Sequence, residues 1–261
     1  SLGPELIHSK TMQHDLQFRK ITCVMTLVWF LLAGFLLSSG VAHAASNGDL
    51  PVRSDIQSQL DALNKQKTLS PQDKLVQQDL TETLETLDKI DRIKQETTQL
   101  RQRVAQAPEK MRQATEALNA LSNQESDDAL RQNFKAMSLR QLESRTSNLV
   151  DDLQSAQNDL SSFNSQLVSL QTQPERVQNA LSTASQQLQQ LRNRLNGNAP
   201  GEAALRPTQQ TLMLVQQALL NAQIDQQRKS LEGNTALQDS LQKQRDYTTA
   251  HINQLEHQLQ L

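Results

Sequence analysis

Apolar residues recur at alternating steps of three and four from residue 139 to residue 195, which predicts one continuous apolar face on a long helix. Thr146 is the polar exception in this series. A seven-residue repeat of this kind buries a narrow stripe against a neighbouring helix, as in coiled coils. The residues of this predicted seam are Leu139, Leu142, Leu149, Leu153, Leu160, Phe163, Leu167, Leu170, Val177, Leu181, Leu188, Leu191 and Leu195, with Ala156 and Ala184 between them.

Pro174 falls where the repeat requires its next apolar residue. A proline inside a helix costs about 3 kcal/mol, because it removes one backbone hydrogen bond and its ring clashes with the preceding turn. We therefore expect a tight hairpin, with Pro174 opening a second helix and Glu175 in its first turn. One kinked helix is the alternative, and the unbroken phase of the repeat across residue 174 favours it.

Three further helices are predicted before the seam. Ser54 is placed to cap a short helix, and the sequence Ser-Pro-Gln-Asp at 70–73 combines a capping hydroxyl, a proline at the first helical position and an acid three residues on. The helix that begins at Pro71 is long. We expect Pro108 to end or bend it, and a short helix over 109–121 to follow. The polar segment 122–128 is expected to be a loop.

Glycines punctuate the chain after the seam. Residues 196–201 form the clearest break, with Gly197 placed as a left-handed helix stop. A helix is predicted over 208–231, a break at Gly233 and a last helix to Leu261, which has no stop signal and suggests a longer protein. Because no alternation of period two competes with these helices, we expect an all-α fold, an elongated bundle of amphipathic helices and helical hairpins with coiled-coil packing.

The N-terminus has the layout of a secretory signal peptide. An uncharged apolar run over 21–41 follows Arg19 and Lys20, and the small-residue triplet at 42–44 follows the run. Ala42 and Ala44 fit an A-x-A site, which predicts cleavage before Ala45 and export. An uncleaved membrane anchor is the alternative, since the run approaches the length of a spanning helix. We thus expect an extension and signal peptide over 1–44 and a helical domain over 45–261.

The composition of residues 45–261 argues against several kinds of core and several kinds of partner for this domain. Its aromatic residues are Phe134, Phe163 and Tyr247, so a thick globular core is not expected. The whole chain has a net charge of −2, which gives no electrostatic case for nucleic acid or an anionic membrane surface. Nothing after Val41 is apolar enough to enter a bilayer. The many glutamines fit solvated helix faces better than an aggregation-prone tract, because they lie within capped heptads.

The chain offers few groups for catalysis. His251 and His257 are six residues apart and lie on different helix faces, unlike a pair four apart that shares a metal. The only cysteine, Cys23, lies in the predicted signal peptide, and no glycine-rich phosphate loop or nucleophile motif is found. We assign no catalytic, cofactor-binding or metal residue and expect no cofactor and no enzymatic activity.

Long stretches of the chain resemble the N-terminal periplasmic region of the large, potassium-dependent members of the MscS family of bacterial mechanosensitive channels. The stretches are SNGDLP at 46–51, DKLVQQDLTETLETLDKIDRIKQET at 73–97, APEKMRQAT at 107–115, NSQLVSLQTQPERVQNA at 164–180 and QIDQQRKSLEGNTALQDSLQKQRDY at 223–247. These stretches are spread over nearly all of the chain after the predicted signal peptide, from residue 46 to residue 247.

This resemblance implies an inner-membrane channel that opens under membrane tension and releases ions and solutes in hypo-osmotic shock. It implies that residues 45–261 lie on the periplasmic side, and that the pore belongs to a C-terminal membrane region forming a homoheptamer. The implied partners are therefore the rest of the channel polypeptide and its neighbouring subunits. From the residues alone, a free periplasmic coiled-coil adaptor or cell-envelope scaffold fits equally well, because both need export and amphipathic helices.

Overall fold

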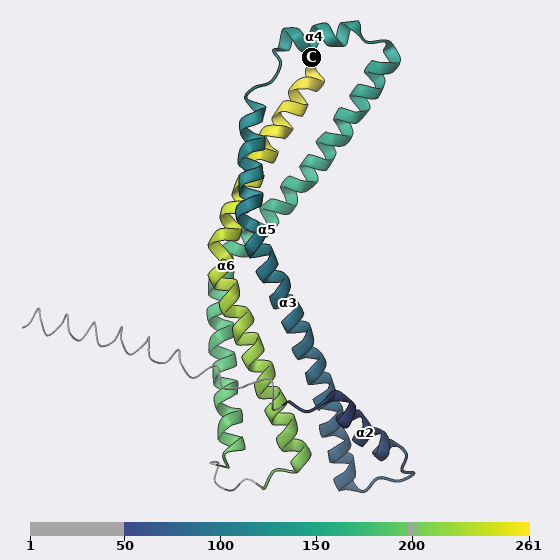
Figure 1. Cartoon of the computed structure of the whole chain (residues 1–261), viewed down its shortest axis with the longest axis vertical. Helices are drawn as coiled ribbons and strands as arrows, with labels where there is room; N and C mark the ends of the chain where they lie inside the picture. The colour runs from purple at the N-terminus through teal and green to yellow at the C-terminus, as the bar shows by residue number, and fades with distance from the viewer. Residues whose placement is uncertain (1–49, 198–200, 202) are drawn as a thin grey trace, which may run out of the picture. The chain divides into compact units, whose positions relative to one another are not determined.

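The computed structural model describes residues 50–197, 201 and 203–261, so the predicted cleavage residues Ala42, Ala44 and Ala45 lie outside the described part. The chain divides into two units, Ser1–Leu50 and Pro51–Leu261, and the described helices lie in the second. These residues form five α-helices and no strand, which confirms the predicted all-α class (Figure 1). The helices are α2 (Arg53–Asn64), α3 (Pro71–Leu121), α4 (Asp127–Ala136), α5 (Leu139–Leu195) and α6 (Pro207–Gln260).

Local sequence explains where the long helices begin. The hydroxyl of Ser70 accepts a hydrogen bond from the backbone N–H of Asp73 at 3.1 Å, and proline follows Ser70 at the first helical position, as predicted. α5 begins with a reciprocal capping box, in which Ser138 and Gln141 each bond the backbone N–H of the other. Gly197 adopts a left-handed φ of 67°, so the predicted stop after α5 is confirmed.

The expected hairpin at Pro174 is wrong, because α5 runs without interruption from Leu139 to Leu195. The kinked-helix alternative had the better evidence, since the heptad phase continues through residue 174. Pro174 is exposed, so its ring meets solvent and not the packed stripe. A helix whose packed stripe continues on both sides of a proline tolerates the loss of one backbone hydrogen bond.

Two other predicted breaks are also wrong. α3 continues through Pro108 to Leu121 without a separate helix over 109–121. α6 continues through Gly233 and Asn234, both of which are buried. Glycine and proline disfavour a helix interior by roughly 1 and 3 kcal/mol, and packing along helices of more than 50 residues outweighs such local terms.

The ten-residue helix α4 differs from the prediction, because it begins at Asp127, inside the segment 122–128 that the sequence predicts to be a loop. Its sequence signals are nevertheless present. Ser126 caps it, accepting a hydrogen bond from the N–H of Ala129 at 3.2 Å, and Asp127 and Asp128 occupy the first turn, where acids stabilise a helix dipole. None of its residues is buried.

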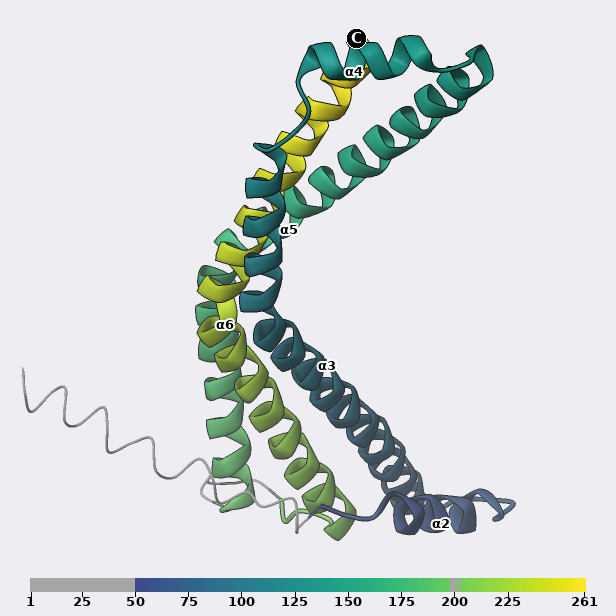
Figure 2. The ribbon, with the colours of Figure 1, turned by 45° about the horizontal axis from the view of Figure 1, so that its top comes forward.

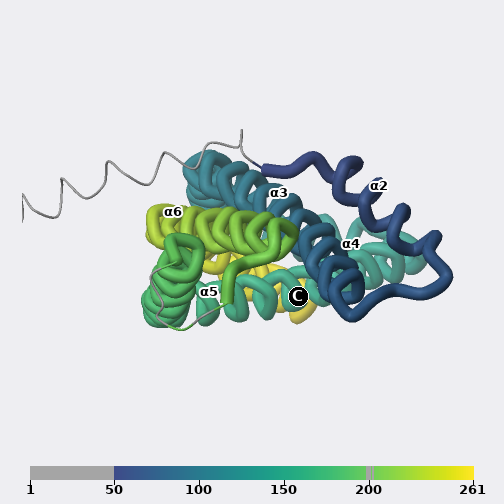
Figure 3. Tube along the Cα trace, turned by 90° about the horizontal axis from the view of Figure 1, so that it is seen from below, coloured from purple at the N-terminus to yellow at the C-terminus, as the bar shows by residue number. Residues whose placement is uncertain are grey.

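Helix α6 packs against both other long helices and lies between them (Figure 3). It runs antiparallel to α5, because Leu188 packs near Leu220 whereas Leu149 packs near Leu255. It runs parallel to α3, because Asp79 meets Arg206 and Val104 meets Gly233. The short α2 packs on α3. α6 is thus the shared partner of the two helices that carry the longest apolar stripes.

Candidate functional site

The face of α6 toward α5 is apolar. Leu149 and Ala156 of α5 form one cluster with Ile252 and Leu255 of α6. Ala184 and Leu188 form a second cluster with Leu220. These clusters lie near opposite ends of the α5–α6 pair, so the seven-residue repeat of α5 follows α6 along most of its length.

The structure places the predicted seam residues as follows. Leu149, Leu167, Val177 and Leu188 are buried, and Leu139 is 73% exposed, outside the packed stripe. Leu139 is the first residue of α5, before the helix meets α6. The remaining seam residues are half-buried: Leu142, Leu153, Leu160, Phe163, Leu170, Leu181, Leu191 and Leu195.

Asn234 of α6 takes over a hydrogen bond that Pro174 removes from α5. In an α-helix, the carbonyl of Leu170 accepts from the N–H of residue 174, and proline has no N–H. The Asn234 side-chain Nδ2 donates to the Leu170 carbonyl at 2.8 Å and to Gln173 Oε1 at 2.8 Å. A buried side chain of one helix therefore satisfies a backbone acceptor of the next, which fixes the register between α5 and α6.

Gly233 is the position where α6 approaches α3 most tightly among the described glycines. A Cβ atom built on it would lie 2.4 Å from Cγ2 of Val104, far inside van der Waals contact. The α3 side of this region carries the small buried residues Ala107 and Ala114, and the α6 side carries buried Ser240. Small side chains allow two helix backbones to pack closely, so α3 and α6 approach each other tightly around Gly233.

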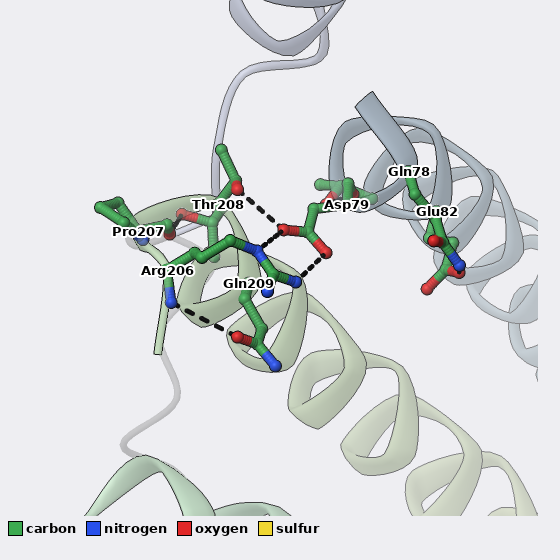
Figure 4. A network of polar contacts seen from close by, with 9 residues as sticks. Gln78, Asp79, Glu82, Arg206, Pro207, Thr208 and Gln209 are labelled. Atoms are coloured by element: carbon green, nitrogen blue, oxygen red, sulfur yellow. Dashed lines mark hydrogen bonds and ion pairs between the residues drawn. The ribbon is translucent and has the colours of Figure 1, made fainter. Parts of the chain in front are cut away.

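A buried ion pair joins the first turn of α6 to α3 (Figure 4). Asp79, only 6% exposed, accepts hydrogen bonds from Arg206 Nε at 3.1 Å, Arg206 Nη2 at 3.2 Å and the Thr208 hydroxyl at 2.8 Å. The hydrogen bond to Asp79 raises the pKa of the Arg206 guanidinium, against the opposing effect of partial burial. Two parallel N–H···O bonds fix direction as well as charge.

Polar groups are buried elsewhere on α3 without breaking the packing. Thr83, Thr86 and Thr97 each donate their hydroxyl to the carbonyl four residues earlier, at 2.6–2.7 Å. In the described part of the chain, every buried side-chain nitrogen and oxygen has a hydrogen-bond partner. The α3 stripe is therefore less apolar than that of α5, yet its polar groups are satisfied locally.

Sequence analysis missed the polar contacts between helices. Asp79 carries a usable signal, because it lies at helical spacing from the stripe residue Ile90, on a face where a carboxylate needs a partner. Arg206 and Thr208 flank the proline that opens α6, and nothing in the sequence relates them to a residue 127 positions earlier. Asn234 follows Gly233, where the sequence predicts a helix break and not a contact with α5.

The described residues contain no group of three or more histidines, cysteines or acids that could hold a metal ion. His257 Nε2 lies 2.9 Å from Asp127 Oδ1, and His251 stacks on Tyr247 with ring centroids 5.6 Å apart. The two histidines therefore contact different residues. No helix in the part of the chain that the structure describes is long and apolar enough to cross a membrane.

The geometry defines a class of protein: a helical module in which one central helix is held to two neighbours by apolar stripes, close backbone approach and a few buried polar bonds. The chain belongs to the family described as the mechanosensitive ion channel porin domain, whose model matches residues 59–261. The family is described as a domain of mechanosensitive ion channels, which is not an enzyme family.

The mechanosensitive channel MscK of Escherichia coli strain K12 is 70% identical to this chain over 224 residues. The match covers 86% of this chain and 20% of the relative, so the chain spans about a fifth of the length of that channel. The similarity is to its N-terminal part, which confirms the resemblance drawn from the sequence stretches. No solved structure matches the chain.

Proposed function

We propose that this chain is the periplasmic N-terminal region of a potassium-dependent mechanosensitive channel that releases ions and solutes in hypo-osmotic shock, with conduction carried by another part of the protein. The observation that supports it is the 70% identity to the corresponding part of E. coli MscK. A free periplasmic adaptor or envelope scaffold is disfavoured by the same match, since the relative carries the name of a channel.

In this proposal residues 1–44 direct export and are removed, leaving Ala45 as the first residue of a periplasmic helical domain over 45–261. Arg19, Lys20 and the alanines at 42 and 44 support it. Mass spectrometry of the protein from the periplasmic side of the inner membrane is expected to find Ala45 at the N-terminus. A mature protein that retains residues 21–41 would contradict cleavage and assign that run as an anchor.

The packing of α6 supports a role in gating. A domain attached to a channel shifts the balance of open and closed states only if its contacts differ between them, typically by 1 to 3 kcal/mol. Displacing α6 from its neighbours would break the Asp79–Arg206 pair on one side and the Asn234–Leu170 bond on the other. The three long helices therefore either move together as one packed body or lose the ion pair and the hydrogen bond that join them.

Patch-clamp recording tests the gating role. In E. coli MscK, replacing the matching region with residues 45–261 of this chain is expected to give a channel that opens under tension. Deleting the region is expected to leave a tension-gated pore with a shifted threshold or potassium response. Loss of the pore from a deleted channel that is still correctly inserted, or currents in bilayers exposed to this chain alone, would show that the activity is misplaced.

Assembly is part of the same proposal. We propose that the partners of this region are the rest of the channel polypeptide and neighbouring subunits of a homoheptamer, in which the subunits associate through the membrane region. Native mass spectrometry of the full-length channel is expected to show seven copies. The same number after deletion of this region would support assembly through the remainder, and dissociation would contradict it.

A further inference from the structure

The middle parts of α3, α5 and α6 lie side by side, as Figure 2 shows, and a groove of about 400 Å³ lies between them. Because α6 packs against both other helices, its residues Leu237 and Leu241 form the floor, and α3 and α5 form the walls. We call this the central groove. Its charged lining residues are Arg103 and Lys110 of α3, both exposed. The central groove is therefore positively charged along one wall.

The two bases of the central groove have no acidic partner. No acid among the residues that the structure describes pairs with Arg103 or Lys110, and the remaining lining residues are uncharged. The two bases are seven residues apart on one helix, which places them about 10 Å apart along its axis. Two negative charges at the same spacing would match them, because facing charges of opposite sign attract and fix the alignment of two surfaces.

The outer face of α6 carries two acids at that spacing. Glu232 and Asp239 are exposed and seven residues apart. They lie about 140–160° around the helix axis from the floor residue Leu237, so they face away from the central groove of their own chain. Lys229, the base nearest to Glu232 in the sequence, pairs with Asp225 at 2.8 Å. Within the described part of the chain, Glu232 and Asp239 therefore have no basic partner.

The acids and the bases also lie at the same levels along the bundle. Val104 of α3 lies against Gly233 of α6, and the two helices run parallel. Arg103 and Glu232 directly precede these two residues, so they share one level. Seven residues further along each helix, the second base and the second acid share another level. Rotation about an axis along the bundle therefore brings the acids of one copy toward the bases of the next without a shift along that axis.

We propose that the central groove receives the outer face of α6 from a second copy of this chain, with Glu232 opposite Arg103 and Asp239 opposite Lys110. This contact rests on the proposed assembly of several subunits, and it adds a contact outside the membrane region. Two different surfaces meet, and each copy carries both, so the contact is of the kind that closes into a ring. A two-fold pair is disfavoured, because groove against groove brings like charges together.

The first test uses cysteine cross-linking in E. coli MscK with its matching region replaced by residues 45–261, which contain no cysteine. A Lys110→Cys/Asp239→Cys channel is expected to form a ladder of disulfide-linked subunits on a denaturing gel, because each copy carries both halves of the contact. A disulfide requires Cα atoms within about 7 Å. The matched control is Lys110→Cys/Asp152→Cys, which uses an exposed acid of α5 instead and is expected to give no ladder.

The second test exchanges the remaining charges in the Lys110→Cys/Asp239→Cys channel. Arg103→Glu or Glu232→Arg alone is expected to slow linking about fivefold, because each places like charges opposite each other. Both changes together are expected to restore the rate, since every contact then has its two charges exchanged. Asp152→Arg makes the same kind of charge change outside the contact and is expected to leave the rate unchanged.

Three results would overturn the interface and leave the proposed function standing. The first is the absence of a ladder in a double-cysteine channel that contains seven copies and opens under tension. The second is equal linking of the Asp152→Cys control, which would show random collision. The third is failure of the exchanged charges to restore linking. By contrast, loss of tension gating in the channel that carries unmodified residues 45–261 would contradict the proposed function, and the interface with it.

Discussion

The two faces of α6 are built from different side chains. Toward α5 it packs Leu220, Ile252 and Leu255 into leucine-rich clusters. Toward α3 it presents Gly233, which lies against Val104, and its first turn is held by an ion pair to Asp79. Both neighbours of α6 bury large apolar residues, since α3 buries Leu80, Leu87, Ile90 and Leu100, but α3 also buries Asp79 and several threonines.

Holding two helices together and fixing their register, the alignment of one helix along the other, depend on different side chains. Leucines at seven-residue spacing hold two helices together, but a slide of one repeat brings similar side chains into contact again. A glycine that accepts one particular valine, or a carboxylate that needs one particular arginine, permits a single alignment. Asn234 brings the same kind of constraint to the α5 face, because only the Leu170 carbonyl lacks its partner through Pro174.

Leu149→Asp is expected to have the largest effect, because it places a charge inside the apolar cluster with Ile252 and Leu255. We expect a loss of about 3–5 kcal/mol in the free energy of unfolding, from lost packing and a desolvated carboxylate. Val150→Asp, one residue along and 47% exposed, is the control and is expected to change stability by less than about 0.5 kcal/mol. Denaturant unfolding followed by circular dichroism measures both, and equal midpoints would refute the buried face.

Asn234→Leu is expected to cost about 1–3 kcal/mol, because the Leu170 carbonyl loses the donor that replaces the missing N–H of residue 174. In a Pro174→Ala background the restored N–H bonds that carbonyl, so the cost of Asn234→Leu is expected to fall. A double-mutant cycle from chemical denaturation gives the coupling. Additive effects would show that Asn234 stabilises the pair in some other way.

Gly233→Ala tests the close approach to α3. Alanine is favoured over glycine inside a helix by about 1 kcal/mol, and the contact with Val104 opposes that gain by about 1–3 kcal/mol. We expect a net loss of stability, and a net gain once Val104→Ala is added. Thermal melts of the four proteins measure this. Stabilisation by Gly233→Ala alone would mean that the helices separate there at little cost.

Asp79→Asn tests the ion pair at the first turn of α6. We expect the melting temperature to fall by several degrees, because Arg206 keeps its charge in a partly buried place without a carboxylate. Asp88→Asn is the matched control, since its pair with Arg53 is exposed. Differential scanning calorimetry compares the two variants, and a larger fall for Asp88→Asn would contradict the ranking.

The smallest expected effect concerns Glu109, whose pKa is held below its ordinary value of 4.5 by its hydrogen bond to Arg112. A carboxyl with a lowered pKa in the folded protein contributes stability above pH 4.5, and that contribution is lost as pH falls through the folded value. The melting temperatures of Glu109→Gln and the unmodified chain are therefore expected to differ slightly at pH 7 and to converge as pH falls below the lowered pKa of Glu109. A difference in melting temperature that widens on acidification would contradict this prediction. High salt is expected to reduce the difference, because the Glu109–Arg112 pair is exposed.

Periodicity, caps and local composition determined much of this protein from the sequence by itself. The capping hydroxyl of Ser70 and the left-handed Gly197 follow from neighbouring residues, so short-range patterns were enough to place them. The heptad phase across residue 174 also indicates the continuous helix α5, whereas the local cost of a proline predicts a break there.

The tertiary structure alone decided which helices pair and where a helix continues through a residue that disfavours it. Pro174 and Gly233 look like breaks because their cost is local, whereas what offsets that cost comes from other helices. Asp79 and Arg206 are 127 residues apart in the chain, and no periodicity relates them. Contacts between distant residues depend on how the helices pack, and the sequence encodes that packing only through the sum of many weak interactions.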